Sequence, residues 1–209
     1  YVDGKIKNIK NICALNIRVA RQVYGCADKI LPYIVENGRI LNTLIVSPPG
    51  CGKTTLIRDI VRQVSNGVPK LNLKGKNVSL IDERGEIASV YEGVASLDVG
   101  VRTDVMSNAS KATGMKMMVR SMSPEVIATD EIGNAEDIVA IKEAVLSGVS
   151  VIFTMHGDSL NSILKNKEIK ELIDSNVFSK IVLLSSGKIP GIVEKIYDTS
   201  KLGGVAWFL

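Results

Sequence analysis

The sequence predicts an α/β fold, a mainly parallel sheet with helices on both faces and a β-hairpin near the C-terminus. Four short apolar runs recur along the chain, and three of them are followed by stretches whose apolar residues have helical spacing. Strands that alternate with helices form parallel sheets that are covered on both faces. A fifth apolar stretch, at 179–198, contains Gly187 and Pro190 between its two halves, which indicates a hairpin turn.

The elements divide into a lead-in and one larger domain. Residues 1–42 form the lead-in, which we expect to be the end of a truncated N-terminal domain. It includes a predicted strand entering a helix at 14–25 and a predicted helix, interrupted near Pro32, at 27–39. Residues 43–209 form the α/β domain. Its predicted strands are 43–47, 77–82, 125–131, 150–155 and an edge strand at 204–209, and its predicted helices are 53–67, 134–148 and a broken segment at 159–175.

Composition narrows the possible function classes. With 45% hydrophobic and 23% charged residues, the 209-residue chain has an ordinary globular composition. Aromatic residues make up only 4% of the chain, and the net charge of +4 comes from scattered Lys and Arg, which argues against a nucleic-acid-binding surface. No apolar run approaches the ~20 residues needed to cross a bilayer, so we expect a cytosolic protein without a transmembrane segment.

A phosphate-binding loop is the most specific motif. Its sequence, SPPGCGKT, departs from the G-x-x-x-x-G-K-[ST] pattern only at the first position. The two glycines let backbone amides approach phosphates closely, the lysine would neutralise the β- and γ-phosphates, and the threonine would bind Mg²⁺. The alternative is an ordinary turn between a strand and a helix. The predicted nucleotide-binding residues are Ser47, Pro48, Pro49, Gly50, Cys51, Gly52, Lys53, Thr54 and Thr55.

Two adjacent acids end the strand at 125–131. Asp130 would complete the Mg²⁺ site together with Thr54, and Glu131 could polarise the attacking water. Paired acids at such a position often do no more than cap the next helix. Because this pair follows a strand in a chain with a phosphate loop, we favour a functional role.

Polar residues also end the neighbouring predicted strands. Glu83 lies in an acidic cluster after the strand at 77–82, while Thr154 and His156 end the strand at 150–155. The carboxyl ends of parallel strands line the ligand crevice of an open α/β sheet. We therefore expect these three residues to converge with Asp130 and Glu131 near the γ-phosphate. A structural role is the alternative for a lone histidine.

The chain lacks the sequence motifs of several classes of phosphate-loop protein. A guanine-specific switch protein has N-K-x-D, but Asn166-Lys167 is followed by Ile169 where the aspartate belongs. The L-S-G-G-Q stretch of transporter ATPases is absent, and no arginine follows Arg120 to form the lid of a small-molecule kinase. The remaining class is a RecA-like, ring-forming P-loop NTPase.

Four blocks in a fixed order resemble the secretion-type ATPases: "SPPGCGKTT", "LIDERGE", "SMSPEVIATDEIGNAEDI" and "FTMHG". Together with "DVGVRTDV", they are similar to the stage III sporulation protein AA family over residues 12–205. The resemblance implies Walker A roles for Lys53 and Thr54 and Walker B roles for Asp130 and Glu131. It places Glu83 in the acidic box and His156 in the histidine box. The secretion motors carry Gly-Glu where this chain has Asp-Glu, so the water-activating base is either Glu131, which we favour, or Glu83.

The resemblance also implies an oligomeric state, a cellular location and partners. It implies a homo-hexameric Mg²⁺-ATPase on the mother-cell side of the forespore, peripherally associated with membrane proteins of a sporulation channel that it energises. Arg102 and Arg120 are candidates for charge stabilisation across a subunit boundary, and the alternative for each is a local salt bridge. Two other functions stay open: a nucleic-acid-translocating ATPase and a scaffold that binds ATP without turnover.

Overall fold

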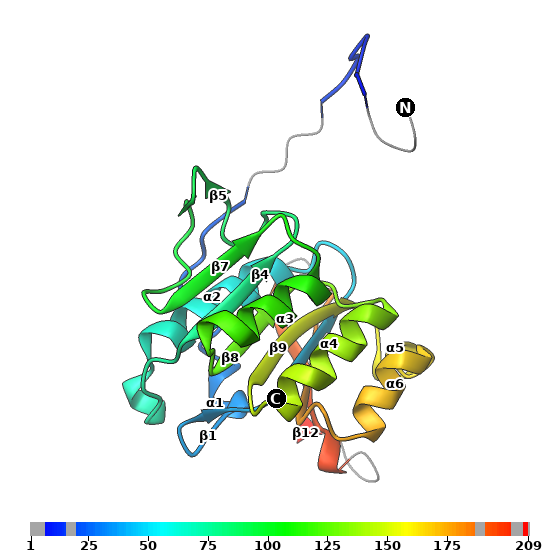
Figure 1. The fold of residues 1–209 in the computed structure, drawn as a ribbon. Coiled ribbons are helices and arrows are strands. Elements are labelled where there is room, and N and C mark those ends of the chain that lie inside the picture. Colours follow the sequence, from blue (N-terminus) through cyan, green and yellow to red (C-terminus); the bar gives the residue numbers. More distant parts are fainter. Residues whose placement is uncertain (1–6, 16–19, 187–190, 202–206, 209) are drawn as a thin grey trace.

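A computed structural model describes residues 7–15, 20–186, 191–201 and 207–208. Its centre is an eight-stranded sheet of order β12-β11-β10-β3-β9-β8-β4-β7 (Figure 1). The six strands from β10 to β7 are parallel, and β11 and β12 continue the sheet antiparallel. The strands are β3 (Thr43–Ser47), β4 (Val78–Asp82), β7 (Thr103–Ser107), β8 (Val126–Thr129), β9 (Ser150–His156), β10 (Lys180–Leu184), β11 (Val193–Asp198) and β12 (Trp207–Phe208).

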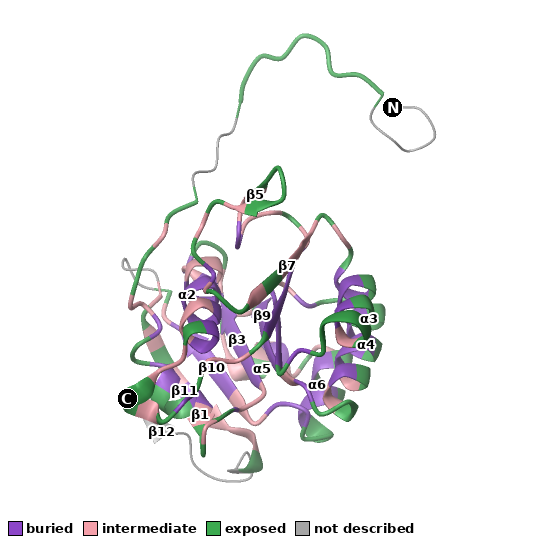
Figure 2. Ribbon diagram, turned by 60° about the vertical axis from the view of Figure 1, so that its left-hand side comes forward, coloured by how far each residue is buried: buried purple, intermediate pink, exposed green. Residues whose placement is uncertain are grey.

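Helices cover both faces of this sheet. Figure 2 shows α2 on one side and α3, α4 and α6 on the other. Each side has its own core of buried side chains, one in which sheet residues pack with α2 and one in which they pack with α3, α4 and α6. The predicted mainly parallel sheet with two covered faces is therefore confirmed. The helices are α2 (Lys53–Asn66), α3 (Lys111–Met122), α4 (Ala135–Leu146), α5 (Leu160–Ile163) and α6 (Lys167–Asp174).

The strands alternate between the two cores. In β9, Ile152 belongs to the core on the α2 side, while Val151 and Phe153 belong to the core on the opposite side. In β3, Ile45 likewise packs on the α2 side, and all five residues of the strand are buried. Successive side chains of a strand point to opposite faces, so a sheet covered twice needs continuous apolar runs. Such runs made these strands predictable.

The lead-in differs from the prediction. The described part of 14–25 contains neither a helix nor a strand, and the predicted helix at 27–39 is reduced to α1 (Leu31–Ile34). β1 (Val35–Glu36) and β2 (Arg39–Ile40) then form a tight hairpin. Its central Asn37 and Gly38 have φ of 50° and 70°, the backbone that a two-residue hairpin turn requires. The Asn-Gly pair was the signal that outweighed helical spacing.

Part of the lead-in packs into the main core. The core on the α2 side includes Ala27, Ile30, Leu31, Ile34 and Ile40. Residues 7–15 instead run away from the body of the molecule (Figure 1). The division of the chain at residue 42 stays a prediction. Among the described residues, no helix is both long and apolar enough to span a membrane.

One strand of the central sheet, β7, and one of the helices that cover it, α3, were not predicted. β7 forms the edge of the sheet beside β4, and α3 follows it and packs beside α4. A small hairpin of β5 (Val90–Tyr91) and β6 (Val94–Ala95) precedes β7, and short 3-10 turns lie at Pro69–Leu71 and Thr199–Lys201.

The two strands of the C-terminal hairpin are confirmed as β10 and β11. The predicted turn residues Gly187 and Pro190 lie outside the described residues, as does 204–206 of the predicted edge strand.

Candidate active site

The phosphate loop joins the end of β3 to the start of α2. Gly50 and Gly52 have φ of 76° and 86°, in the left-handed region that favours glycine. Gly52 is the residue immediately before α2, whose first turn contains Lys53, Thr54 and Thr55. The free amides and the positive dipole end of a helix therefore meet the loop, which is the arrangement that binds phosphate.

Lys53 is buried within this loop, with 6% of its surface exposed. Its ammonium donates to the carbonyl oxygens of Ser47, at 3.0 Å, and Pro48, at 3.2 Å, and to the Ser47 hydroxyl at 3.2 Å. It also lies 3.0 Å from Nδ1 of His156. Burial lowers the pKa of Lys53, and the nearby Glu131 carboxylate opposes that change. The ammonium is thus held where a phosphate group would enter.

His156 connects Lys53 to Glu131. It ends β9 directly beside Ser47, its partner in the parallel register. Because an ammonium can only donate, the Nδ1 atom of His156 must accept from Lys53. The hydrogen of the neutral ring then sits on Nε2, which donates to Oε1 of Glu131 at 2.7 Å. The geometry assigns one tautomer and points it at Glu131.

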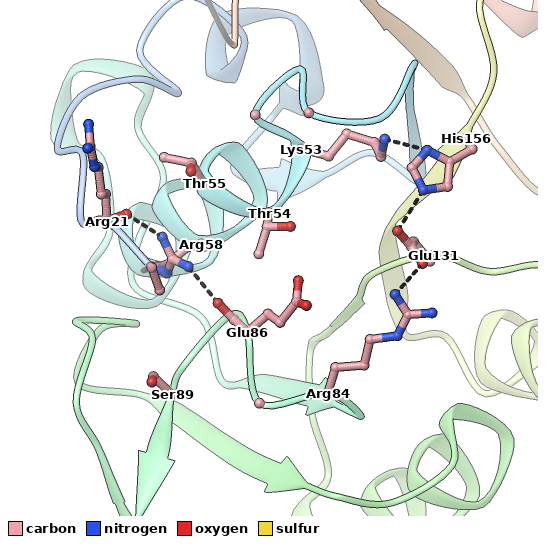
Figure 3. Close-up of a pocket in the computed structure, with 14 residues that line it drawn as sticks. Arg21, Lys53, Thr54, Thr55, Arg58, Arg84, Glu86, Ser89, Glu131 and His156 are labelled. Atoms are coloured by element: carbon pink, nitrogen blue, oxygen red, sulfur yellow. Dashed lines mark hydrogen bonds and ion pairs between the residues drawn. The ribbon is translucent and has the colours of Figure 1, made fainter. Parts of the chain in front are cut away.

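Glu131 is held on several sides. Its backbone amide donates to the Thr154 hydroxyl at 3.0 Å, and its φ of 42° is strained for a residue with a side chain. Its second carboxylate oxygen pairs with Arg84 at 2.9 Å (Figure 3). Partial burial alone would raise the pKa of Glu131, but Arg84, His156 and Lys53 together lower it. The side chain is therefore an ionised carboxylate.

Asp130 is buried next to Glu131, with 4% of its surface exposed. Burial raises its pKa to about 6; Lys111 opposes this, and the neighbouring Asp82 and Glu131 add to it. Among the described residues, its carboxylate has no hydrogen-bond partner. A buried carboxylate without a donor fits a bound cation, and the Thr54 hydroxyl would add a second oxygen ligand of the kind that Mg²⁺ prefers.

The acids after β4 have separate roles. Asp82 is fully buried and accepts from the amides of Glu86, at 2.9 Å, and Ala88, at 2.8 Å, which shapes the loop at 83–88. Glu83 pairs with Lys111 and does not line the cavity described below. Glu86 does line that cavity. The structure therefore brings Glu131 and His156 together in the cavity, and the acid that this loop contributes to it is Glu86. Their convergence on a γ-phosphate stays a prediction.

Arg58 anchors the same loop to α2, a role that sequence reasoning missed. Its guanidinium is buried and donates to the carbonyl oxygens of Ile87 at 2.5 Å, Glu86 at 2.7 Å and Arg21 at 2.7 Å. The signal was present in the sequence, because Arg58 lies on the apolar face of a helix between Ile57 and Ile60. A charged residue at such a position needs buried partners.

These side chains surround one cavity of about 560 Å³. Figure 3 shows Lys53, His156 and Glu131 at one end and Arg21, Arg58 and Ser89 at the other. The phosphate loop, α2, the loop at 83–88 and the lead-in all contribute to its wall. The lining residues are Ala20, Arg21, Gly50, Gly52, Lys53, Thr54, Thr55, Arg58, Arg84, Gly85, Glu86, Ser89, Glu131 and His156.

The other predicted site residues lie elsewhere. Arg102 lies at the N-terminal end of β7, whereas the phosphate loop follows the C-terminal end of β3. The Arg102 side chain donates to the Ser65 carbonyl at 3.3 Å. Arg120 is exposed near the end of α3 and lines a groove between α3 and α4. Neither residue faces the cavity of its own chain, so their action on a neighbouring subunit stays a prediction. The other residues predicted for the loop or site that do not line the cavity are Ser47, Pro48, Pro49, Cys51, Glu83, Asp130 and Thr154.

Two solved structures have a similar fold. The ATPase DotB of Legionella pneumophila is 18% identical with a TM-score of 0.58, and the match covers 79% of this chain and 48% of that one. The VirB11 ATPase from the Brucella suis type IV secretion system, in complex with sulphate, is 15% identical with a TM-score of 0.55 over 83% of this chain and 52% of that one. These similarities confirm the predicted RecA-like fold.

Sequence comparison identifies the family. The stage III sporulation protein AA of Bacillus subtilis (strain 168) is 44% identical over 196 residues, which are 94% of this chain and 63% of the relative. The chain thus spans somewhat less than two thirds of the length of that relative. The model of the family "Sporulation stage III, protein AA" matches residues 2–203. The chain therefore belongs to the sporulation stage III protein AA family.

Proposed function

We propose that this chain is an Mg²⁺-dependent ATPase of the secretion-motor type, which energises a channel or secretion complex during endospore formation. The observation that supports it most is the meeting of the phosphate-loop Lys53 with Glu131, through His156, in one cavity. The fold similarity to secretion ATPases and the family membership support it in addition. A homo-hexamer on the mother-cell side, docked on membrane proteins of the channel, belongs to the same proposal.

Nucleotide binding would use the loop and the start of α2. The amides after Gly50 and the positive end of α2 would face the phosphates. Lys53 would exchange its contacts with Ser47 and Pro48 for phosphate oxygens. Thr54 and Asp130 would hold Mg²⁺, which neutralises charge on the β- and γ-phosphates when bound.

Hydrolysis would depend on Glu131. The ionised carboxylate would accept a proton from water as the water oxygen bonds to the γ-phosphorus. The bond between that phosphorus and the β,γ-bridging oxygen would break, leaving ADP and inorganic phosphate. His156 would orient Glu131 through its Nε2–H. Glu86 is the second carboxylate that lines this cavity and is a further candidate base.

Phosphate release and nucleotide binding, measured on the same variants, test this function. We expect Lys53→Ala to abolish binding and Glu131→Gln to retain ATP but slow turnover by about 10²–10⁴-fold. Arg39→Gln changes an exposed residue that does not line the cavity and should leave both unchanged. Wild-type turnover in Glu131→Gln would transfer the base role to Glu86 or Glu83, which matched glutamine variants would separate. Tight ATP binding by the intact chain without phosphate release would instead indicate a scaffold.

A further inference from the structure

Four charged or polar side chains form a continuous line along one end of the cavity (Figure 3). Lys53 contacts His156 at 3.0 Å, His156 contacts Glu131 at 2.7 Å, and Glu131 contacts Arg84 at 2.9 Å. Each member comes from a different segment: the start of α2, the end of β9, the residues after β8 and the loop after β4. The line therefore joins the phosphate loop to the loop at 83–88.

Arg84 is the least constrained member of this line. Its side chain is 56% exposed and lines the cavity, while the backbone around it is held by Asp82 and Arg58. The base of the side chain is thus fixed and its guanidinium has room to move. An ion pair this exposed adds little to stability.

Both carboxylate oxygens of Glu131 are engaged in this arrangement, one by His156 and one by Arg84. Resting on the proposed ATPase function, we infer that Arg84 senses the γ-phosphate. It leaves Glu131 for the terminal phosphate of a bound nucleoside triphosphate and so frees the carboxylate for water. Arg84 would then be the residue by which this site distinguishes ATP from ADP.

The chemistry of the two partners favours this exchange. A guanidinium binds phosphate through two parallel hydrogen bonds, and the terminal phosphate carries more charge than one carboxylate. Lys53 would turn to the same phosphates, so the Nδ1 atom of His156 would lose its donor at the same time. Glu131 would keep only the hydrogen bond from His156, the contact that orients it. A diphosphate lacks the group that draws Arg84 away.

The alternative is that Arg84 and Glu131 form a surface ion pair with no role in nucleotide recognition. The effect of an Arg84 substitution on the affinities for ATP and ADP distinguishes the two explanations. We would measure dissociation constants for ADP and for a non-hydrolysable ATP analogue by competition with a fluorescent nucleotide. The exchange predicts that Arg84→Gln weakens binding of the ATP analogue about 5- to 20-fold and binding of ADP less than about twofold. Arg84→Lys keeps the charge and should recover part of the loss. Arg39→Gln, outside the cavity, should change neither constant.

A second measurement tests the exchange itself. Glu131→Gln removes the carboxylate that holds Arg84. It should therefore raise the affinity for the ATP analogue more when Arg84 is present than in the Arg84→Gln background. Equal weakening of both nucleotides by Arg84→Gln, or no weakening, would overturn the inference while the proposed ATPase stands. Independent effects of the two substitutions would overturn it too. A wild-type chain that binds neither nucleotide would overturn the proposed function first.

Discussion

Asp130 shows how a functional demand opposes stability at a single residue. Its carboxyl group is buried among other acids, and its pKa is raised to about 6 chiefly by that burial. Ionisation therefore costs more in the folded chain than in the unfolded chain, and a bound cation would offset that cost. The usual value of 3.8 applies to the unfolded chain, which binds fewer protons than the native state between pH 3.8 and about 6. Stability accordingly falls as the pH rises through this window.

Asp130→Asn should stabilise the protein at high pH. Above pH 6 the full cost of the buried charge, about 3 kcal/mol, is present, and at pH 5 only part of it is. Urea unfolding in EDTA at pH 5 and pH 8 measures the difference, with the exposed Asp104→Asn as a control. Mg²⁺ should then stabilise the wild type and leave the variant unchanged. A stability difference that is the same at both pH values would contradict the assignment.

At the scale of elements, Arg58 determines the shape of the cavity wall. Its buried guanidinium donates three hydrogen bonds to backbone carbonyl oxygens. These bonds hold the loop at 83–88 and the lead-in against α2. Removal of Arg58 leaves carbonyl oxygens of Ile87 and Glu86 without their donor. Such groups cost about 1–3 kcal/mol each when buried.

We therefore expect Arg58→Ala to lower the free energy of unfolding by about 2–4 kcal/mol. Arg58→Lys should recover little, because a single ammonium cannot reproduce the planar fork. Urea denaturation is the measurement, and Arg39→Ala is a matched control because Arg39 is exposed. A loss below about 0.5 kcal/mol for Arg58→Ala would show that the loop is held by Asp82 alone.

The contact between α3 and β4 depends on a glycine. A Cβ atom at Gly114 would lie 2.8 Å from Cγ2 of Ile81, closer than packed carbon atoms approach. Glycine to alanine usually stabilises a helix by about 1 kcal/mol. Here we expect Gly114→Ala to destabilise by about 1–3 kcal/mol, since overpacking outweighs helix propensity. The measurement is again urea denaturation. In an Ile81→Ala background the penalty should shrink or reverse, and an unchanged penalty would refute the steric explanation.

Among the parallel strands, the sequence predicted those whose burial is nearly complete. β3 and β9 are buried on both faces and appear as apolar runs, whereas edge strand β7 is only half buried and has the mixed sequence TDVMS. α3 contains Gly114, a residue of low helix propensity, and only some of its apolar residues are buried. The phosphate loop was identified because its chemistry requires certain residues at fixed spacing.

The roles of individual acids could not be predicted in the same way. Asp82, Glu83 and Glu86 lie within five residues of each other, yet one shapes the loop, one pairs with Lys111 and one lines the cavity. Which acid faces the nucleotide depends on the path of the loop. That path is held by the Asp82 carboxylate and by hydrogen bonds from Arg58, which is distant in the sequence.

At the scale of the whole molecule, the proposed motor predicts activity that depends on assembly. Arg102 and Arg120 lie away from the cavity of their own chain, so any charge they give to a nucleotide must reach a neighbouring subunit. Phosphate release per subunit should rise with protein concentration and be lost in Lys53→Ala and Glu131→Gln. Constant activity per subunit from dilute to concentrated protein would count against a site completed by a neighbour.

The position of β3 in the sheet governs when the protein can fold. This strand carries the phosphate loop, and it lies between β9 and β10, whose paired residues come more than 100 positions later in the chain. During synthesis, β3 must therefore wait until β9 has left the ribosome before its first neighbour can pair with it, and until β10 has followed before the second can. Long-range parallel pairing of this kind makes folding slow. The nucleotide cavity is consequently among the last parts of the molecule to form.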